Sequence, residues 1–450
     1  MNRLFRRRYV LNMIAWRLRG LRVRKLYEEL MGREFWSAEQ WRECQDSLLR
    51  SFVRHCYENV PFYRDRFDSV NLKPGEIGSV EDIEKIPVLK KEEVRANTER
   101  LLATNFSKSK LKEGHTTGST GAPLTFYGSR QRGEYTVAGL WRIYSRCGWE
   151  PGEGVASIWG FSDAAVKMPG PKKWLRDIAS GTTHLNAWEA NEEEFAQWCK
   201  ILRKRKPGVL ICYASSGSRF AKWLLDHDER LPDFKGVYCT SEKLYAAQRD
   251  QLAEAFQCPV FDMYGCGEAI HIACTCERQN MHTSPDMCVV ETGQADETGR
   301  KPLIITGLRN WAMPFLRYMN GDCGELKEGF CECGRKSPLM QLDFTRVADV
   351  FTFADGKKYP SLYFVLRLYK EGFDGVGLFQ FHQDTIDHIY LRIAKNPDFT
   401  DQTANNLKAA VEEIEEHIKH QAKVEILYVD NIDQSANAKH YYAKSDVDRR

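Results

Sequence analysis

The segment His115–Pro123 reads HTTGSTGAP, and it is the most informative part of the sequence. Its residues are small, so a turn formed by them can present consecutive backbone N–H groups to an anion without an intervening side chain. Hydroxyl groups add donors for the oxygens of a triphosphate, at Thr116, Thr117, Ser119 and Thr120. A P-loop needs Gly-Lys followed by Ser or Thr, whereas Gly121 is followed here by Ala122 and Pro123. The segment predicts a phosphate-binding loop of another kind, and the alternative is an ordinary flexible loop.

Length and composition indicate a soluble globular protein with a large domain and at least one smaller one. Of the 450 residues, 42% are hydrophobic and 28% are charged, which is enough to build a sizeable core. The 65 basic and 62 acidic residues give a formal net charge of +3, and no basic block is interleaved with aromatic residues. Nucleic-acid binding is therefore not expected. The 14 cysteines and the lack of a membrane-length apolar run favour a reducing, cytoplasmic location.

The N-terminal residues 1–27 differ from this average, because they contain nine Lys or Arg and no acidic residue. Apolar residues recur among them at helical spacing, at Val10, Met13, Ile14, Leu18 and Leu21. A basic amphipathic helix of this kind can lie on anionic lipid, and its alternative is a helix that packs one face on the protein body. We expect at most a weak contact with a membrane surface through this segment.

The rest of the chain divides into a helical preface and an α/β core. Ser37 with Gln40 resembles a capping box before a helix that ends near Pro61. From about residue 110 to 340, β-rich runs alternate with helical patterns such as Tyr245–Phe256; the runs cover 208–215, 258–265 and 302–308. This alternation predicts the α/β class.

The pattern changes after Phe344 to that of a compact α+β unit. Asp355 and Gly356 mark a hairpin, and further elements are expected at 378–393, 401–421 and 424–429. We place a domain boundary between Asp343 and Asp349. The predicted division is a helical preface over 1–110, an α/β core over 111–343 and a C-terminal α+β domain over 344–450.

Three later motifs supply side chains suited to a magnesium nucleotide. They read DMYGCGE (262–268), PFLRYMNGD (314–322) and SANAKHYY (435–442). Mg²⁺ prefers one or two carboxylates together with phosphate oxygens, which Glu268 could provide. Asp322, in a Gly-Asp turn, could accept hydrogen bonds from both ribose hydroxyls, and Tyr264 offers a flat face for a purine. Each motif alone is more often an ordinary turn or strand end, and only their order makes them informative.

With these motifs in place, the chain resembles the adenylate-forming ligases and, within them, the phenylacetate-CoA ligase and CapK-like branch. The resemblance runs along nearly the whole chain, through NVPFYRDRF, EDIEKIPVLKKEEVR, TTGSTGAP, TSEKL, FDMYGCGE, MPFLRYMNGD and CECGRKSP. It implies a large multi-layer adenylation domain joined by a hinge to a mobile C-terminal domain. It also implies that a carboxylic acid is joined to the α-phosphate of ATP with release of pyrophosphate, and that the acyl group then passes to a thiol such as coenzyme A.

The resemblance assigns roles to individual positions. It implies that the loop Thr116, Thr117, Gly118, Ser119, Thr120 and Gly121 holds the phosphates. Ser241, Glu242 and Tyr264 would line the adenine pocket, Glu268 would hold Mg²⁺, and Asp322 would hold the ribose. Arg346, in TRVAD, matches the arginine that precedes the interdomain hinge.

Lys439 is the expected catalytic cation, with Arg317 as a second candidate. Attack of a carboxylate on an α-phosphate brings two anions together, and a cation aimed at the non-bridging oxygens stabilises the transition state. Lys439 lies in IDQSANAKHYY, where the family usually has a proline early and a glycine directly before the lysine; here those positions are Asp433 and Ala438. A lysine in a polar tail is otherwise usually solvated.

The departures from the family pattern affect the second half-reaction more than the first. The hinge usually reads Gly-Arg-x-Asp-Asp, and the segment 345–349 keeps the arginine but only one of the two acids. The glycine that guides coenzyme A aligns only loosely, near Gly356. An amine, hydroxyl or cofactor acceptor, in polysaccharide or secondary metabolism, or a non-catalytic nucleotide-binding role, therefore remains as the alternative.

Cysteine spacing predicts a structural zinc site. CTCERQNMH ends in Cys276 and His282, and Cys331 and Cys333 form a second pair about fifty residues later. Thiolates and imidazole suit tetrahedral zinc, and four protein ligands leave no open position for catalysis. Cys274 competes with Cys276 for its place. The alternative is that these thiols are small buried hydrophobic groups or reduced surface residues.

Overall fold

The computed structural model separates the chain into two compact units. Unit 1 comprises residues 1–292, 303–320 and 326–341, and unit 2 comprises 293–302, 321–325 and 342–450. The structure describes residues 22–116, 124–160, 181–187, 192–296, 299–346, 350–356, 358–360, 364–365, 367–368, 376–396, 398–432 and 442–447. The last passage from one unit to the other occurs at Gln341 and Leu342.

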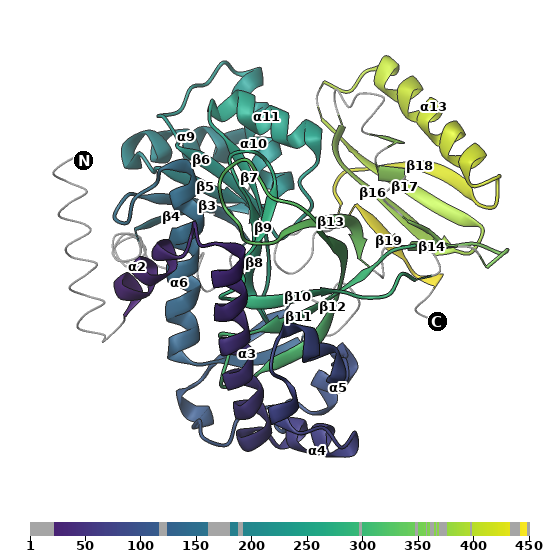
Figure 1. Ribbon diagram of the computed structural model, residues 1–450. Coiled ribbons are helices and arrows are strands. Elements are labelled where there is room, and N and C mark those ends of the chain that lie inside the picture. Colours follow the sequence, from purple (N-terminus) through teal and green to yellow (C-terminus); the bar gives the residue numbers. More distant parts are fainter. Residues whose placement is uncertain are drawn as a thin grey trace. The chain divides into compact units, whose positions relative to one another are not determined.

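The helical start of unit 1 (purple in Figure 1) contains α2 (Val23–Gly32), α3 (Ala38–Asn59), α4 (Pro61–Ser69) and α5 (Lys91–Ala96), with short 3₁₀ turns at Pro74–Glu76, Val80–Lys85 and Lys108–Lys110. Ser37 caps α3 as expected: its Oγ accepts from the Gln40 N–H at 3.2 Å, and the Gln40 side chain accepts from the Ser37 N–H at 3.0 Å. Pro61 ends α3 but also begins α4, because proline is well suited to the first position of a helix.

An 11-stranded sheet forms the centre of the core. In spatial order it contains β10 (Cys288–Thr292), β11 (Pro302–Gly307), β12 (Phe315–Lys327), β13 (Leu339–Arg346), β9 (Met281–Thr283), β8 (Ile270–Thr275), β7 (Val260–Cys266), β6 (Gly236–Thr240), β5 (Val209–Cys212), β3 (Val155–Trp159) and β4 (Thr182–Asn186). The strands from β4 to β7 pair in parallel. The pairings β7–β8 and β8–β9 are antiparallel. A separate hairpin pairs β1 (Lys112–Thr116) with β2 (Leu124–Gly128).

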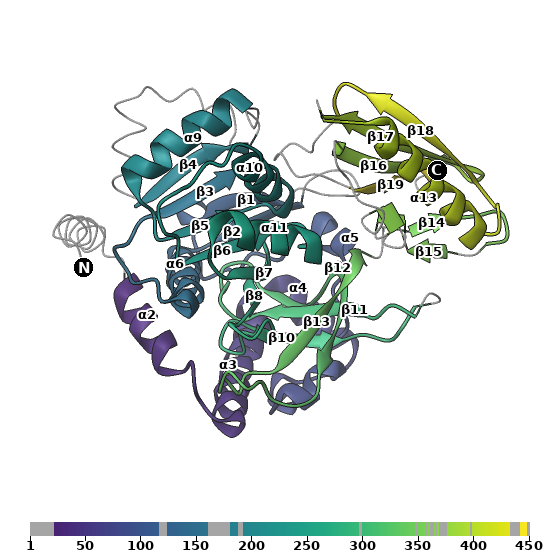
Figure 2. The same ribbon diagram turned by 90° about the horizontal axis from the view of Figure 1, so that it is seen from above.

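Helices cover both faces of the parallel part of the sheet (Figure 2): α6 (Arg130–Tyr144) lies on one face, and α9 (Glu192–Arg205), α10 (Ala214–Asp226) and α11 (Ala246–Phe256) lie on the other. Neighbouring residues of β6 show the two layers. The Tyr238 hydroxyl donates to the Ile143 carbonyl of α6 at 2.9 Å. The Cys239 sulfur faces Cys212, whose own sulfur would lie 2.5 Å from a Cβ at Gly217 of α10. The expected α/β class is therefore confirmed.

Unit 2 has its own α+β fold. A four-stranded mixed sheet has the order β18 (Lys423–Val429), β17 (His388–Lys395), β16 (Val376–Thr385) and β19 (Ala443–Ser445). Helix α13 (Asp401–His417) buries Leu407, Ala410, Val411 and Ile414, which share one helical face. The predicted hairpin is present, with β14 (Val350–Thr352) paired to β15 (Lys358–Pro360) and Gly356 at φ +76° in the turn.

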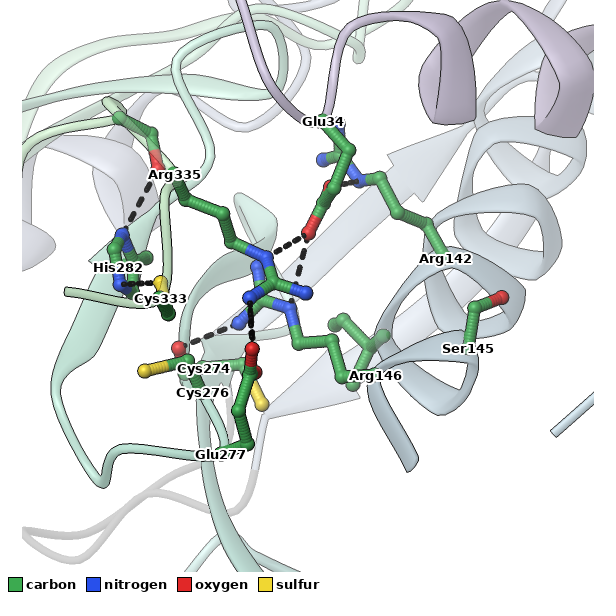
Figure 3. Close-up of polar contacts among 12 residues, drawn as sticks. Glu34, Arg142, Ser145, Arg146, Cys274, Cys276, Glu277, His282, Cys333 and Arg335 are labelled. Carbon is green, nitrogen blue, oxygen red and sulfur yellow. Dashed lines mark hydrogen bonds and ion pairs between the residues drawn. The ribbon is translucent and has the colours of Figure 1, made fainter. Parts of the chain in front are cut away.

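A buried ion-pair network joins distant segments of unit 1 (Figure 3). Glu34, in the corner between α2 and α3, accepts from Arg335 Nε at 2.6 Å and pairs with Arg146 at 3.3 Å. Arg142 of α6 binds both carboxylate oxygens of the fully buried Asp286, at 2.9 and 3.0 Å. Burial alone would raise the pKa of Glu34, but the surrounding arginines hold that pKa below its usual value.

We expect Gly139→Ala to destabilise the protein, although alanine is the better helix former. A Cβ at Gly139 would lie 2.6 Å from Cδ2 of His271 on β8, and the Nε2–H of His271 donates to the Thr136 carbonyl of α6 at 2.8 Å. The substitution should cost about 1–3 kcal/mol in urea unfolding. The matched control is Gly133→Ala on the same helix, where nothing lies within 4 Å of the new Cβ; it should stabilise by about 0.5–1 kcal/mol. Equal effects at the two positions would contradict this packing.

Glu34→Gln should lower the free energy of unfolding by about 3 kcal/mol, because it leaves buried guanidinium groups without their anionic partner. The control is Glu28→Gln, which removes an exposed pair with Arg24 at 2.7 Å and should change stability by less than about 0.5 kcal/mol. Both changes in the free energy of unfolding are to be measured by urea unfolding at neutral pH. A Glu34 variant as stable as the Glu28 variant would show that the network contributes little.

Candidate functional site

The carboxyl ends of the parallel strands gather the residues of two separate motifs. Thr240 of β6 pairs with Met263 of β7, so Ser241 and Tyr264 follow at the same level of the sheet edge. Ligands of open α/β sheets bind at such carboxyl edges. TSEKL and DMYGCGE therefore lie side by side at this edge.

The turn after β6 is shaped by Ser241, which has a left-handed backbone at φ +69°. The next residue, Glu242, reaches the start of α10, where its Oε2 accepts from the Ser215 N–H at 2.8 Å. A carboxylate at a helix N-terminus is favoured by the helix dipole, which fixes the position of this turn. Farther along the same edge, the rings of Trp159 and Tyr213 pack with centroids 4.3 Å apart.

Strand β12 holds Tyr264 and Glu268 in place. Asn320 Nδ2 donates to the Tyr264 hydroxyl at 2.8 Å, and the Tyr318 hydroxyl donates to Glu268 Oε1 at 3.2 Å. Tyr318 and Asn320 are two residues apart, so they project from the same face of the strand. Glu268 is only 5% exposed and lies beside Arg132, which donates to the neighbouring Gly267 carbonyl.

Arg317 is held by its own partners in this arrangement. Its guanidinium binds Glu291 through Nε at 3.1 Å and Nη2 at 2.7 Å, and its Nη1 donates to the carbonyls of Glu84 and Ile86. These contacts connect β10 to the 3₁₀ segment before α5. A catalytic role for Arg317 stays a prediction and would require some of these bonds to be exchanged.

The structure describes only some of the other residues expected to bind the nucleotide. Asp322 lies within β12 and not in a turn, because Gly321 at φ +89° kinks the strand without ending it. Thr116 ends β1 and Arg346 ends β13, and only their backbone is described. The remaining expected residues, Thr117, Gly118, Ser119, Thr120, Gly121 and Lys439, lie outside the described residues.

The predicted Cys and His ligands come together. The ligand atoms of Cys276, His282, Cys331 and Cys333 all lie within 4.8 Å of one another. Cys276 and Cys331 have sulfurs 3.6 Å apart, and Cys333 Sγ lies 3.3 Å from His282 Nε2. Cys274 is buried on β8 and lies outside this cluster, with its sulfur beside the Thr275 carbonyl at 3.4 Å.

The partners around the cluster were not predicted. Arg335 binds both Glu277 oxygens at 2.9 and 3.0 Å and also reaches Glu34, so it lies between the cluster and the α2–α3 corner (Figure 3). Glu34 and Arg335 are 301 positions apart in the chain, and no local pattern connects them. The CECGR spacing, which places Arg335 two residues after Cys333, is the signal in the sequence that could have suggested it.

The structure bears differently on the two expectations about membranes, which concern a membrane-spanning helix and the basic N-terminal segment. Within the described residues, none of the helices combines the length and the apolar composition needed to cross a bilayer. The basic helix expected over residues 1–27 falls mostly outside the described residues, which begin at Arg22.

Comparisons with known proteins agree with the fold and the motifs. Residues 354–446 match the family model of the CapK C-terminal domain. Protein CapK of Staphylococcus aureus is 26% identical over 286 residues, which cover 63% of each chain and thus less than two thirds of that relative. Phenylacetate-coenzyme A ligase of Thermus thermophilus is 24% identical over 341 residues, which cover 72% of this chain and 74% of the relative.

A solved structure shows the same fold over almost the full length. The crystal structure of 2-hydroxyisobutyryl-CoA ligase, in the postadenylation state with R3-HIB-AMP, has a TM-score of 0.72. It covers 93% of this chain and 92% of its own, at 18% identity. This likeness confirms the expected large α/β domain followed by a smaller domain. The matches to CapK and to phenylacetate-CoA ligases support the resemblance to the phenylacetate-CoA ligase and CapK-like branch of the adenylate-forming ligases, and the structural likeness shows the same fold.

Proposed function

We propose that this protein is an ATP-dependent, AMP-forming ligase that activates a carboxylic acid as its acyl-adenylate, releases pyrophosphate, and passes the acyl group to coenzyme A. The observation that carries the proposal is that TSEKL, DMYGCGE and the Tyr318–Asn320 segment converge on the carboxyl edge of β6 and β7. Similarity to this branch supports the same reaction, since several of the similar proteins are named as phenylacetate-coenzyme A ligases.

The nucleotide would be bound by residues with separate tasks. The Tyr264 ring would stack on the purine, with its hydroxyl held by Asn320 and Ser241 beside it on the edge. The main-chain donors and hydroxyls of 116–121 would hold the phosphates, and the carboxylate of Asp322 would accept from the ribose hydroxyls. Arg346, the last residue of β13, would add a further contact to the nucleotide, at the position that precedes the hinge in the family.

Glu268 fits the requirements of a magnesium ligand. Its carboxylate is buried, and one oxygen is oriented by the Tyr318 hydroxyl at 3.2 Å, as expected of a ligand held by an outer partner. When bound with ATP, Mg²⁺ would neutralise phosphate charge as pyrophosphate leaves. The carboxylate of Glu268 would supply one protein oxygen to that ion.

The chemical step needs a cation near the α-phosphate. A carboxylate oxygen of the acid bonds to the α-phosphorus, the bond from that phosphorus to the bridging oxygen breaks, and pyrophosphate departs. Lys439 would stabilise the charge on the non-bridging oxygens. In the second half-reaction the thiol sulfur would bond to the acyl carbon and AMP would leave. The cysteine and histidine cluster would take no part, since four protein ligands leave no position open for a substrate.

An acceptor other than coenzyme A is the second candidate. The match of residues 354–446 to the CapK C-terminal domain favours it, because this part of the chain contains the loosely aligned Gly356 and the Ala438 that precedes Lys439. The acyl group or the adenylyl group would then pass to an amine, a hydroxyl or a cofactor, as in polysaccharide or secondary metabolism. A nucleotide-binding protein without catalysis is the remaining alternative.

We expect acid-dependent exchange of labelled pyrophosphate into ATP, measured over a panel of aryl, short-chain and fatty acids. Lys439→Ala should lower this exchange by about 100-fold or more, because it removes the cation from the transition state. Lys444→Ala is the matched control, since Lys444 is partly exposed and pairs with Asp446 at 3.4 Å; it should retain activity within about twofold. Exchange that ignores the acid, or that survives Lys439→Ala, would exclude the proposed adenylation.

The acceptor can be identified separately from adenylation. With the best acid and ATP, coenzyme A should raise the rate of AMP release by at least about tenfold and yield a thioester detectable by mass spectrometry. Hydroxylamine, which traps acyl-adenylates, should give a hydroxamate without coenzyme A. A hydroxamate without any thioester would retain the ligase chemistry and favour the non-thiol acceptor.

A further inference from the structure

The cluster of Cys276, His282, Cys331 and Cys333 has the dimensions of a tetrahedral metal site. Zn–S bonds of about 2.3 Å place two sulfur ligands about 3.8 Å apart, and a sulfur and a nitrogen ligand about 3.5 Å apart. The separation of Cys276 Sγ and Cys331 Sγ is 3.6 Å, and that of Cys333 Sγ and His282 Nε2 is 3.3 Å. All remaining pairs of ligand atoms are within 4.8 Å.

We propose that these four side chains bind one Zn²⁺ ion, and that this ion keeps Arg335 in position to anchor the corner between α2 and α3. The ion would join the turn between β8 and β9 to the loop between β12 and β13. Its role is structural and independent of the proposed ligase reaction.

The two loops support their sulfurs in the same way. The Arg278 N–H donates to Cys276 Sγ at 3.3 Å, and the Cys333 N–H donates to Cys331 Sγ at 3.5 Å. In both loops the donor lies two residues after the cysteine, so the two turns repeat one geometry. Asn280 Nδ2 adds a third donor, to Cys331 Sγ at 3.2 Å. Donors aimed at sulfur stabilise thiolates, the form that binds metal.

His282 is oriented for coordination. Its Nδ1 lies 3.3 Å from the Ser337 hydroxyl, while its Nε2 faces Cys333. A hydrogen bond from Nδ1–H to Ser337 leaves the Nε2 lone pair directed at the cluster, as in metal sites where an outer partner selects the tautomer. The ring is fully buried, so rotation out of this position would leave polar atoms unsatisfied.

The surrounding charge suits a zinc site with three thiolates. Such a centre with one neutral imidazole carries a net charge of −1, which needs compensation when buried. In the ion-pair network of unit 1, four arginines pair with three carboxylates, which leaves one positive charge in excess; the members are Arg33, Arg142, Arg146 and Arg335 with Glu34, Glu277 and Asp286. An anionic metal centre would reduce this excess.

Arg335 connects the metal cluster to the corner between α2 and α3, because it follows closely after Cys333 in the chain. Arg335 comes two residues after Cys333, and its guanidinium binds Glu34 at 2.6 Å and Glu277 at 2.9 Å. Its cation also lies over the ring of Phe35, 5.2 Å from the ring centre. Fixing Cys333 therefore limits the positions that Arg335 can take, and through it those of residues 34 and 35.

A disulfide is the rival explanation for neighbouring sulfurs. A disulfide would join two of the sulfurs at about 2.05 Å. It would not explain why the third cysteine and the histidine lie beside them. All 14 cysteines are free in this structure, Cys276 and Cys331 included. Three thiols and one imidazole around a common centre fit a metal better than a single S–S bond.

The first test is the metal content of the full-length protein, purified with a non-chelating reductant. We expect about one zinc per chain by plasma mass spectrometry, and a cobalt-substituted sample should show the absorption bands of tetrahedral thiolate coordination. Cys276→Ser should lower the zinc content at least about tenfold, whereas Cys274→Ala and Cys258→Ser should keep it. His282→Cys should retain zinc, because cysteine can also bind the ion, whereas His282→Ala should lose zinc. This pair of variants distinguishes the loss of a metal ligand from a failure to fold. Less than about 0.1 zinc per chain in the wild type, or an oxidised Cys276–Cys331 pair, would overturn the proposal.

The second test addresses the corner. Removal of zinc by a chelator should make trypsin cleave at Arg33 at least about tenfold faster, with a fragment that ends there identified by mass, and zinc should restore resistance. Cys258→Ser should respond in the same way as the wild type. If a zinc-binding protein shows no change at Arg33 upon chelation, the anchoring role is excluded while the site itself stands.

Discussion

The pairing of β6 with β7 is the constraint on which the candidate site depends. Parallel hydrogen bonding from Val237 to Thr240 sets a register in which Ser241, just past β6, and Tyr264 of β7 lie at one level. Because a shift of one residue turns every side chain to the opposite face, this register determines which groups point toward a ligand at the edge. The layers of helices on both faces bury the sheet and make such a shift costly.

Contacts from distant segments then give these edge residues their orientation. Tyr318 and Asn320 come from β12, 50 and 56 positions after the side chains they bind, and one face of that strand contacts both Tyr264 and Glu268. Arg317 directly precedes Tyr318 in the chain and contacts Glu291 with its guanidinium. Alternation along one strand thus separates residues that face the site from a residue that holds the scaffold.

Features formed by residues close together in the sequence could be predicted more fully than contacts between residues far apart in the sequence. The capping box at Ser37 and the turn at Gly356 act over a few residues, so local spacing predicted them correctly. The four expected Cys and His ligands also come together, although their two halves are about fifty positions apart. Asp322 was expected in a turn and lies in a strand, because Gly321 can occur in a kinked strand as well as in a turn. The ion-pair network was not predictable, since Glu34 meets partners that lie over a hundred positions away.

Strand β8 connects the cysteine and histidine cluster to the candidate site. It begins at Ile270, two residues after Glu268, and ends at Thr275, directly before Cys276. At its start the pairing with β7 contains a bulge between Tyr264 and Gly265, where a Cβ would lie only 2.4 Å from the Ile270 carbonyl oxygen. A bulge adds one residue to a strand and is often found next to functional sites, where it re-aims a side chain. One strand thus positions both the turn that carries Glu268 and the first ligand of the cluster, at its opposite ends, although the cluster takes no part in the proposed ligase reaction.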